Sequence, residues 1–239
     1  MTTLRNILTC IILIMMWSCK NEAVTKEAPD FIEKDTSAVK NIRTNNETTN
    51  YEVTEDTVTN INFDGFSVSI SRLVIFDEER RLQQIQADTV YIEPELAETI
   101  EGQKIKVTSG NLKNISIEQR YETSVTIMYG GPHCDLTEWK HYRSEWQALE
   151  KNSDGDFLCK EYTATEADKF PEVSIDELKT AVRKYCGEGG AEHIAKVTSP
   201  TDYPSGVGIS RYYLRITGQQ ADTNETVVKL IIIYVAMGC

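Results

Sequence analysis

Residues 115–129 read ISIEQRYETSVTIMY and form the clearest structural pattern in the chain. Alternate positions from Ile115 to Tyr129 are mostly apolar or aromatic, and the positions between them are mostly polar or charged. This period of two is the period of a β-strand, whose successive side chains point to opposite faces of a sheet. The segment therefore predicts one long strand with a core face and a largely wet face, as an antiparallel sheet allows. Fully extended it would run about 50 Å, so we expect it to bend.

Shorter strands are predicted on both sides of this segment. Phe66, Val68 and Ile70 alternate with serines, which indicates a half-buried strand. Residues 211–217 alternate in the same way near the C-terminus. Residues 226–236 are almost continuously apolar, which is typical of a strand covered on both faces and predicts a central position in the sheet.

Two amphipathic helices are predicted between these strands. The first would cover 136–149, where large apolar residues are spaced 3, 3, 4 and 3 apart: Leu136, Trp139, Tyr142, Trp146 and Leu149. The second would begin after Ser174, since Ser174 and Glu177 have the spacing of a capping box. Gly187 is expected to end it.

The order of strands, helices and strands favours an α+β fold. We expect a single globular domain over 61–239, with an antiparallel, curved β-sheet and two helices on one face. Residues 19–60 are rich in Thr, Asn, Glu and Lys and poor in large apolar residues, which predicts a flexible tether. Residues 1–18 have the composition of a signal peptide.

The signal is identified by its pattern of charge and hydropathy. A short polar start containing Arg5 precedes an apolar run from Ile7 to Trp17, which is too short to cross a bilayer as a helix. Met16-Trp17-Ser18-Cys19 then resembles the lipobox of bacterial lipoproteins. The resemblance implies cleavage before Cys19, acylation of Cys19, and attachment to the lipid bilayer of a Gram-negative envelope. Lys20 directly after this cysteine favours the outer membrane.

Four further cysteines are expected to form two disulfides, because an exported protein folds in an oxidising compartment. They are Cys134, Cys159, Cys186 and Cys239. Three pairings are open, of which we favour Cys134–Cys159 with Cys186–Cys239. A four-thiolate metal site is disfavoured because no two of these cysteines are close in sequence.

Residues 150–161 resemble the calcium-binding loop of EF-hand proteins. The oxygen ligands would come from Asn152, Asp154, Asp156 and Glu161, with Gly155 at the sharp bend. The alternative, which we favour, is a β-hairpin turn followed by a strand, since Asn-Ser-Asp-Gly is ordinary turn chemistry. Calcium is the one cofactor that the sequence suggests.

A binding surface is suggested by three aromatic residues, Trp139, Tyr142 and Trp146, which would share one helix face and could contact a sugar or a protein. The alternative is that this stripe belongs to the core. The net charge of −12 disfavours nucleic acid as a partner. The chain carries no nucleophile-elbow, P-loop or dinucleotide-binding motif, and we assign no catalytic residue.

These features favour a lipid-anchored envelope or cell-surface module that binds a ligand or has a structural role. One alternative is an acidic inhibitor or immunity-type protein that binds a basic exported enzyme. A second is a hydrolase that depends on carboxylates, which are too abundant in the sequence to select a pair.

Replacing Cys19 with Ser is expected to abolish lipidation, because acylation requires the thiol of that residue. The measurement is incorporation of radiolabelled palmitate in cells, together with the fraction of protein in the membrane pellet. Cys10→Ser, which changes the other signal-region cysteine, is the matched control and should be labelled like the wild type. Persistent labelling of the Cys19→Ser variant would contradict the lipoprotein assignment.

Overall fold

The structure is a computed structural model of the whole chain, and it describes residues 40–44, 47–53, 58–73, 82–86, 88–95, 98–128 and 133–237. The chain divides into two units, Met1–Lys34 and Asp35–Cys239, and every described residue belongs to the second. Residues 1–18, Cys19, Tyr129 and Cys239 lie outside the described residues. No helix of the described part is both long and apolar enough to cross a membrane.

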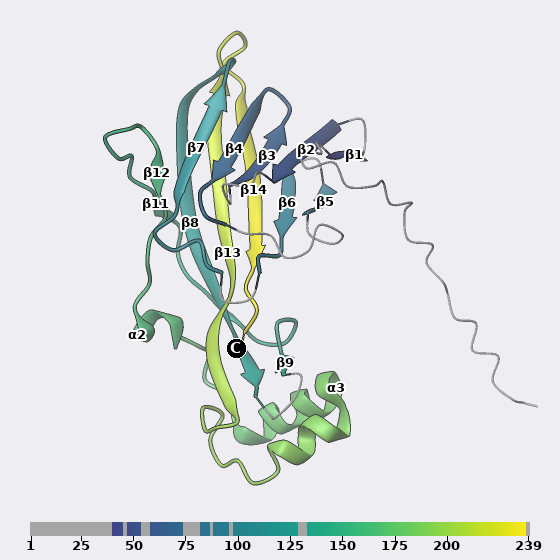
Figure 1. The fold of residues 1–239 in the computed structure, drawn as a ribbon. Coiled ribbons are helices and arrows are strands. Elements are labelled where there is room, and N and C mark those ends of the chain that lie inside the picture. The colour runs from purple at the N-terminus through teal and green to yellow at the C-terminus, as the bar shows by residue number, and fades with distance from the viewer. Residues whose placement is uncertain are drawn as a thin grey trace, which may run out of the picture. The chain divides into compact units, whose positions relative to one another are not determined.

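Two β-sheets make up most of the described structure (Figure 1). The six-stranded sheet is antiparallel throughout and contains, in spatial order, β1 (Lys40–Thr44), β2 (Glu47–Val53), β3 (Thr59–Phe63), β4 (Phe66–Ile70), β7 (Lys104–Ser109) and β12 (Phe157–Leu158). The eight-stranded sheet has the main path β10 (Tyr142–Arg143), β8 (Leu112–Ile127), β13 (Ser205–Gln220), β14 (Thr226–Tyr234), β6 (Thr89–Ile92) and β5 (Leu82–Gln86). Two short strands, β9 (Cys134–Asp135) and β11 (Gln147–Ala148), also pair with β8. The pair β14–β6 is parallel, so this sheet is mixed.

The long predicted strand is β8, and the prediction of its core face is confirmed. Ile117, Tyr121, Val125 and Ile127 are all buried on that face. The opposite face is wet only in its first half, because every residue from Tyr121 to Ile127 is buried. The two C-terminal strands are confirmed as β13 and β14, and β14 lies between β13 and β6 as its continuous apolar sequence predicts.

A β-bulge in β13 keeps its apolar residues on the core face. Ile209 lies opposite Thr123 and Arg211 lies opposite Glu122, so Ser210 is one extra residue on β13. Val207 and Ile209 therefore lie on the same face as Tyr212 and the alternate residues after it. Without the extra residue, odd-numbered and even-numbered positions would point to opposite faces. The Ser210 hydroxyl lies 2.8 Å from the Ser124 hydroxyl and donates to the Glu122 carbonyl at 3.3 Å, which satisfies the buried polar groups at the bulge.

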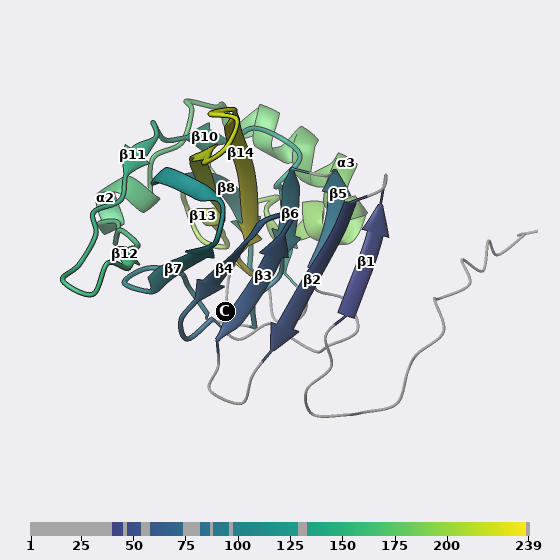
Figure 2. The same cartoon turned by 90° about the horizontal axis from the view of Figure 1, so that it is seen from above.

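The core face of the eight-stranded sheet packs against two different partners. Near one end it meets the six-stranded sheet (Figure 2), and the shared core includes Ile61, Val68, Ile117, Leu214 and Ile231. Near the other end it meets helix α3 (Ile175–His193) through Leu178, Val182, Val125 and Ile127. The predicted capping box of this helix is confirmed: Ser174 and Glu177 bond each other's backbone amides. Gly187, at φ +74° and ψ −175°, is non-helical and divides α3 into two helical parts across a kink.

The prediction of a helix over 136–149 is wrong. This segment runs antiparallel along the open edge of β8 as β9, β10 and β11, with loops between them. Its apolar residues enter different cores: Leu136 packs near α3, whereas Leu149 packs between the sheets. The exposed N–H and C=O groups of a long edge strand compete with helix formation, and the hydrogen bonds from Leu136 N to Val125 O and from Leu149 N to Ile117 O show that pairing with the edge is preferred.

The α+β prediction fits only loosely, because the described chain is mostly strand and forms two sheets in place of one. Its helices are α3 and the short α2 (Ala164–Ala167). Strands β1 and β2 also fall within 19–60, the segment predicted as a tether. Composition misses them because strand pairing at a sheet edge is made by backbone groups, which polar sequences also provide.

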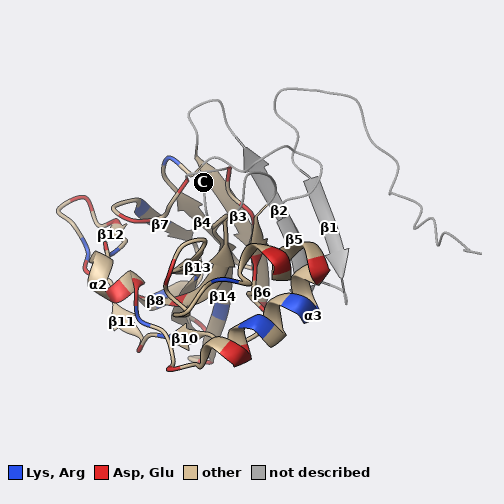
Figure 3. Cartoon of the chain, turned by 90° about the horizontal axis from the view of Figure 1, so that it is seen from below, with Lys and Arg blue, Asp and Glu red and all other residues tan. Residues whose placement is uncertain are grey.

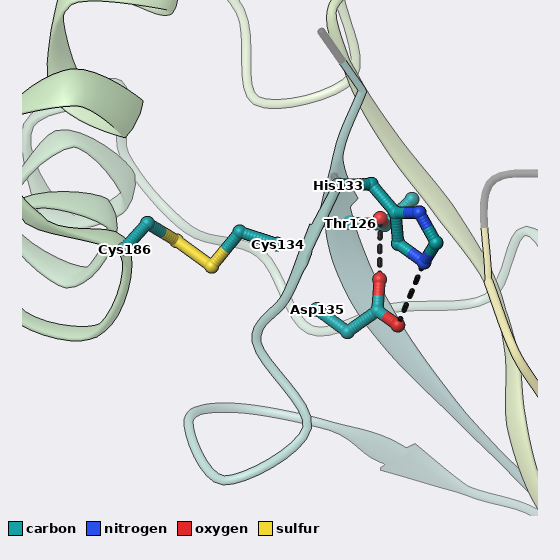
Figure 4. Close-up of a disulfide and its surroundings, with 5 residues drawn as sticks. All are labelled: Thr126, His133, Cys134, Asp135 and Cys186. Carbon is teal, nitrogen blue, oxygen red and sulfur yellow. Dashed lines mark hydrogen bonds and ion pairs between the residues drawn. A yellow bond between two sulfur atoms is a disulfide. The ribbon is translucent and has the colours of Figure 1, made fainter. Parts of the chain in front are cut away.

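The structure contains a disulfide between Cys134 and Cys186, so both favoured pairings, Cys134–Cys159 and Cys186–Cys239, are wrong. This bond joins β9 to α3 (Figure 4). Next to it, Asp135 accepts a hydrogen bond from Thr126 at 2.5 Å and lies 3.3 Å from the His133 ring, which holds β9 on the edge of β8. Cys159 is a buried free thiol, and burial raises its pKa to about 12.

Removal of the disulfide in a Cys134→Ala/Cys186→Ala variant is expected to lower the free energy of unfolding by about 2–4 kcal/mol, because the bond closes a long loop in the unfolded chain. Urea unfolding measures this loss. Peptide mapping without reduction should recover the cross-link between Cys134 and Cys186 and leave Cys159 as a thiol. A Cys134–Cys159 cross-link in the mapped peptides would contradict the assigned pairing.

Candidate functional site

The face of the eight-stranded sheet that points away from both cores carries a cluster of arginine and aromatic side chains. We call it the arginine–aromatic face and define it by Glu118, Arg120, Glu122, Arg143, Trp146, Arg211, Tyr213 and Arg215. Strand register places these residues in neighbouring positions: Glu118 lies opposite Arg215, Arg120 opposite Tyr213, and Glu122 opposite both Arg211 and Arg143. Arginine and glutamate thus face each other across strands, an arrangement that stabilises a sheet surface.

Glu122 is the centre of this face, and its side chain is 0% exposed. Arg143, from β10, donates to Oε2 of Glu122 through Nε at 2.8 Å and also through Nη2. Arg211, from β13, donates to Oε1 at 3.0 Å, and the hydroxyl of Tyr213 donates to Oε2 at 2.8 Å. One buried carboxylate therefore connects three strands, and its charge is balanced by two guanidinium groups.

Contact with Glu122 shifts the pKa values of its hydrogen-bond partners. Burial alone would lower the pKa of Arg143, but the hydrogen bond to Glu122 and the nearby Tyr213 hydroxyl outweigh it and raise the pKa. Burial raises the pKa of Tyr213, and the negative charge of Glu122 raises it further. Both pKa shifts keep Arg143 and Tyr213 protonated, so both side chains remain hydrogen-bond donors to Glu122.

Arg120 differs from the other arginines of this face because it forms no ion pair with a carboxylate of the described residues. Its guanidinium carbon lies 4.2 Å from the ring centroid of Trp146 and 4.8 Å from that of Tyr213. Its Nε is buried without a hydrogen-bond partner among the described residues. Burial lowers the pKa of Arg120, and the positive charge of Arg143 lowers it further. Arg120 is therefore a partly desolvated cation held against aromatic rings, and the nearby charge of Glu122 also favours its charged form.

The remaining two arginines combine an ion pair with an aromatic contact. Arg215 bonds Glu118 at 2.6 Å through Nη2 and lies 4.3 Å from the ring centroid of Trp146. Arg211 bonds Glu138 at 2.5 Å and lies 4.8 Å from the ring of Tyr234, on the adjacent strand. Trp146 is thus contacted by two cations, Arg120 and Arg215.

The charges of this face leave a positive excess. Four arginines are present, and the carboxylates that pair with them are Glu118, Glu122 and Glu138. The whole chain carries a net charge of −12, so this local excess runs against the general composition. Planar guanidinium groups held by aromatic rings are suited to binding a carboxylate or a phosphate, since little side-chain entropy remains to be lost.

The three aromatic residues predicted to form a binding surface are separated in the structure. Trp139 packs against Phe170 beside the α3 core, with ring centroids 6.2 Å apart. Tyr142 packs against the core between the sheets, near Tyr121. Only Trp146 belongs to the arginine–aromatic face. The separation follows from the strand conformation of 136–149, because a strand does not keep residues three or four apart on one face.

The segment 150–161 forms a hairpin turn in the structure. The side-chain oxygen of Asn152 accepts hydrogen bonds from the backbone N–H groups of Asp154 and Asp156, both at 2.9 Å. Gly155 occupies a left-handed conformation at φ +86°, which favours glycine. Glu161 lies beside Gly102, outside the turn. Among the described residues, no group of three or more His, Cys, Asp and Glu side chains is arranged to hold a metal ion.

Replacing Glu122 with Gln is expected to lower the free energy of unfolding by about 3 kcal/mol, because Arg143 and Arg211 lose the buried charge that they share. Glu138→Gln is the matched control: Glu138 also bonds Arg211 but is 74% exposed, so its loss should cost less than about 1 kcal/mol. Urea unfolding at neutral pH compares the two variants. Equal, small losses would show that Glu122 does not organise the face.

Comparison with known proteins provides no independent assignment for this face. No protein-family model, curated protein or solved structure matched the chain. The role proposed below therefore rests on the sequence and on the geometry of the arginine–aromatic face.

Proposed function

We propose that the chain is a binding module anchored by lipid at Cys19 to the envelope of a Gram-negative bacterium, in the outer membrane, and that the arginine–aromatic face binds its ligand. The lipobox resemblance supports the lipid anchor, and the disulfide-forming cysteines support an exported location. The ligand is another envelope component, a glycan or a protein. This face carries a positive excess that differs from the acidic composition of the chain.

The observation that carries the proposal is the environment of Arg120. A guanidinium group that is partly removed from water without a carboxylate partner costs free energy, which a purely structural role does not require. The aromatic contacts of Trp146 and Tyr213 offset part of this cost and hold the group in one plane. A ligand that supplies the missing acceptor would offset the rest.

The alternative of an acidic inhibitor receives less support. Such a protein needs a surface of one sign of charge to attract a basic enzyme. Figure 3 shows acidic and basic positions interspersed along α3, and the arginine–aromatic face has a positive excess. The carboxylates of that face are all engaged by arginine, which likewise gives the hydrolase alternative no specific support.

Trp146→Ala is expected to weaken binding of the full-length lipoprotein to isolated envelope fractions at least about fivefold, since an aromatic anchor of a binding surface contributes more than about 1 kcal/mol. The protein, kept in detergent micelles, is titrated against envelope fragments, and the bound fraction is measured after sedimentation. Tyr185→Ala, an exposed aromatic residue on α3, is the matched control and should bind like the wild type. The proposal fails if the wild type does not bind, or if both variants bind equally well.

A further inference from the structure

We infer that the ligand of the arginine–aromatic face is a glycan with widely spaced carboxylate groups, one of which binds between Arg120 and Arg215 beside Trp146. The inference rests on the proposed function and deepens it by naming the ligand class.

The position of the anion follows from the two cations that contact one ring. The guanidinium carbons of Arg120 and Arg215 lie 4.2 and 4.3 Å from the ring centroid of Trp146. Among the described residues, Glu118 is the carboxylate that forms an ion pair with one of them, Arg215. Two positive charges at one ring with one bonded negative partner favour a second negative group, and no carboxylate of the described residues bonds Arg120.

The rest of the molecule argues against a dense polyanion. A dense polyanion would also lie close to acidic residues that give the chain its net charge of −12, and would be repelled by them. An isolated carboxylate on an otherwise neutral chain experiences mainly the local arginines, because salt screens charges beyond about 8 Å. The charge pattern therefore fits a ligand whose acidic groups are far apart.

The topology argues against an extended peptide on this side of the sheet. Peptides commonly bind a sheet by adding a strand to an open edge. The edge of β8 next to Arg120 is already paired by β9, β10 and β11. What remains accessible is the face itself, with Trp146 at its border, and aromatic rings beside hydrogen-bonding side chains suit sugar rings.

The test uses a tetrasaccharide with glucuronate at alternate positions and its methyl ester, which has the same sugars without the charge. Isothermal titration calorimetry with the full-length lipoprotein in micelles is expected to show binding of the acid and at least tenfold weaker binding of the ester. Arg120→Gln should reduce binding of the acid at least tenfold, and Arg183→Gln, an exposed arginine on α3, should leave it unchanged. Thermal melting confirms that each variant is folded.

A second variant moves the affinity in the opposite direction and so does not depend on the stability of Arg120→Gln. Glu118→Gln removes the carboxylate that competes for Arg215, and it should tighten binding of the acid severalfold. Equal binding of acid and ester, or unchanged binding by Arg120→Gln, overturns the carboxylate inference. Binding of envelope fragments or of an acidic peptide without binding of the tetrasaccharide overturns the glycan class but leaves the proposed function standing. Loss of envelope binding itself overturns both.

Discussion

A single buried carboxylate, Glu122, organises the outer face of the eight-stranded sheet. Glu122 belongs to β8 and accepts hydrogen bonds from residues of β10 and β13. Three strands are therefore joined through one side chain. A buried charge is tolerated only when its hydrogen-bonding groups have partners. Two arginines and a tyrosine are the partners of Glu122. Because Arg143 and Arg211 are held by Glu122, Arg120 lies among aromatic rings without an ion pair in the described part of the chain. The arrangement that suggests a ligand is thus a consequence of this one contact.

The two faces of the eight-stranded sheet carry different kinds of residues. One face carries alternate apolar residues of β8 and β13 into two cores, one closed by the second sheet and the other by α3. The bulge at Ser210 preserves this division along β13, because the extra residue places Ile209 and Tyr212 on the same face. The disulfide between Cys134 and Cys186 then connects β9 to α3, at the end where the sheet has only a helix to cover it. The outer face is left for charged and aromatic residues.

The sequence predicted those elements whose pattern is local and strongly periodic. The two-residue period of β8 and the capping box at Ser174 specify their structures without reference to distant residues. The segment 136–149 could not be predicted in this way, because its spacing fits a helix while its backbone pairs with β8. The arginine–aromatic face was missed for a related reason: its residues come from β8, β10, β13 and a loop, and only strand register brings them together. The alternating arginines 211 and 215 around Tyr213 were the one local signal, and their meaning depends on Glu122.

The most direct test of this account is side-chain NMR of the arginine Nε–H groups in the unliganded protein. The account predicts slow hydrogen exchange for Arg143, whose Nε–H is bonded to Glu122, and for Arg120, whose Nε–H is buried beside Trp146. Exposed arginines such as Arg183 should exchange rapidly under the same conditions. Rapid exchange at Arg120 and Arg143, at the rate of Arg183, would show that the outer face is not organised around Glu122 and would contradict the account.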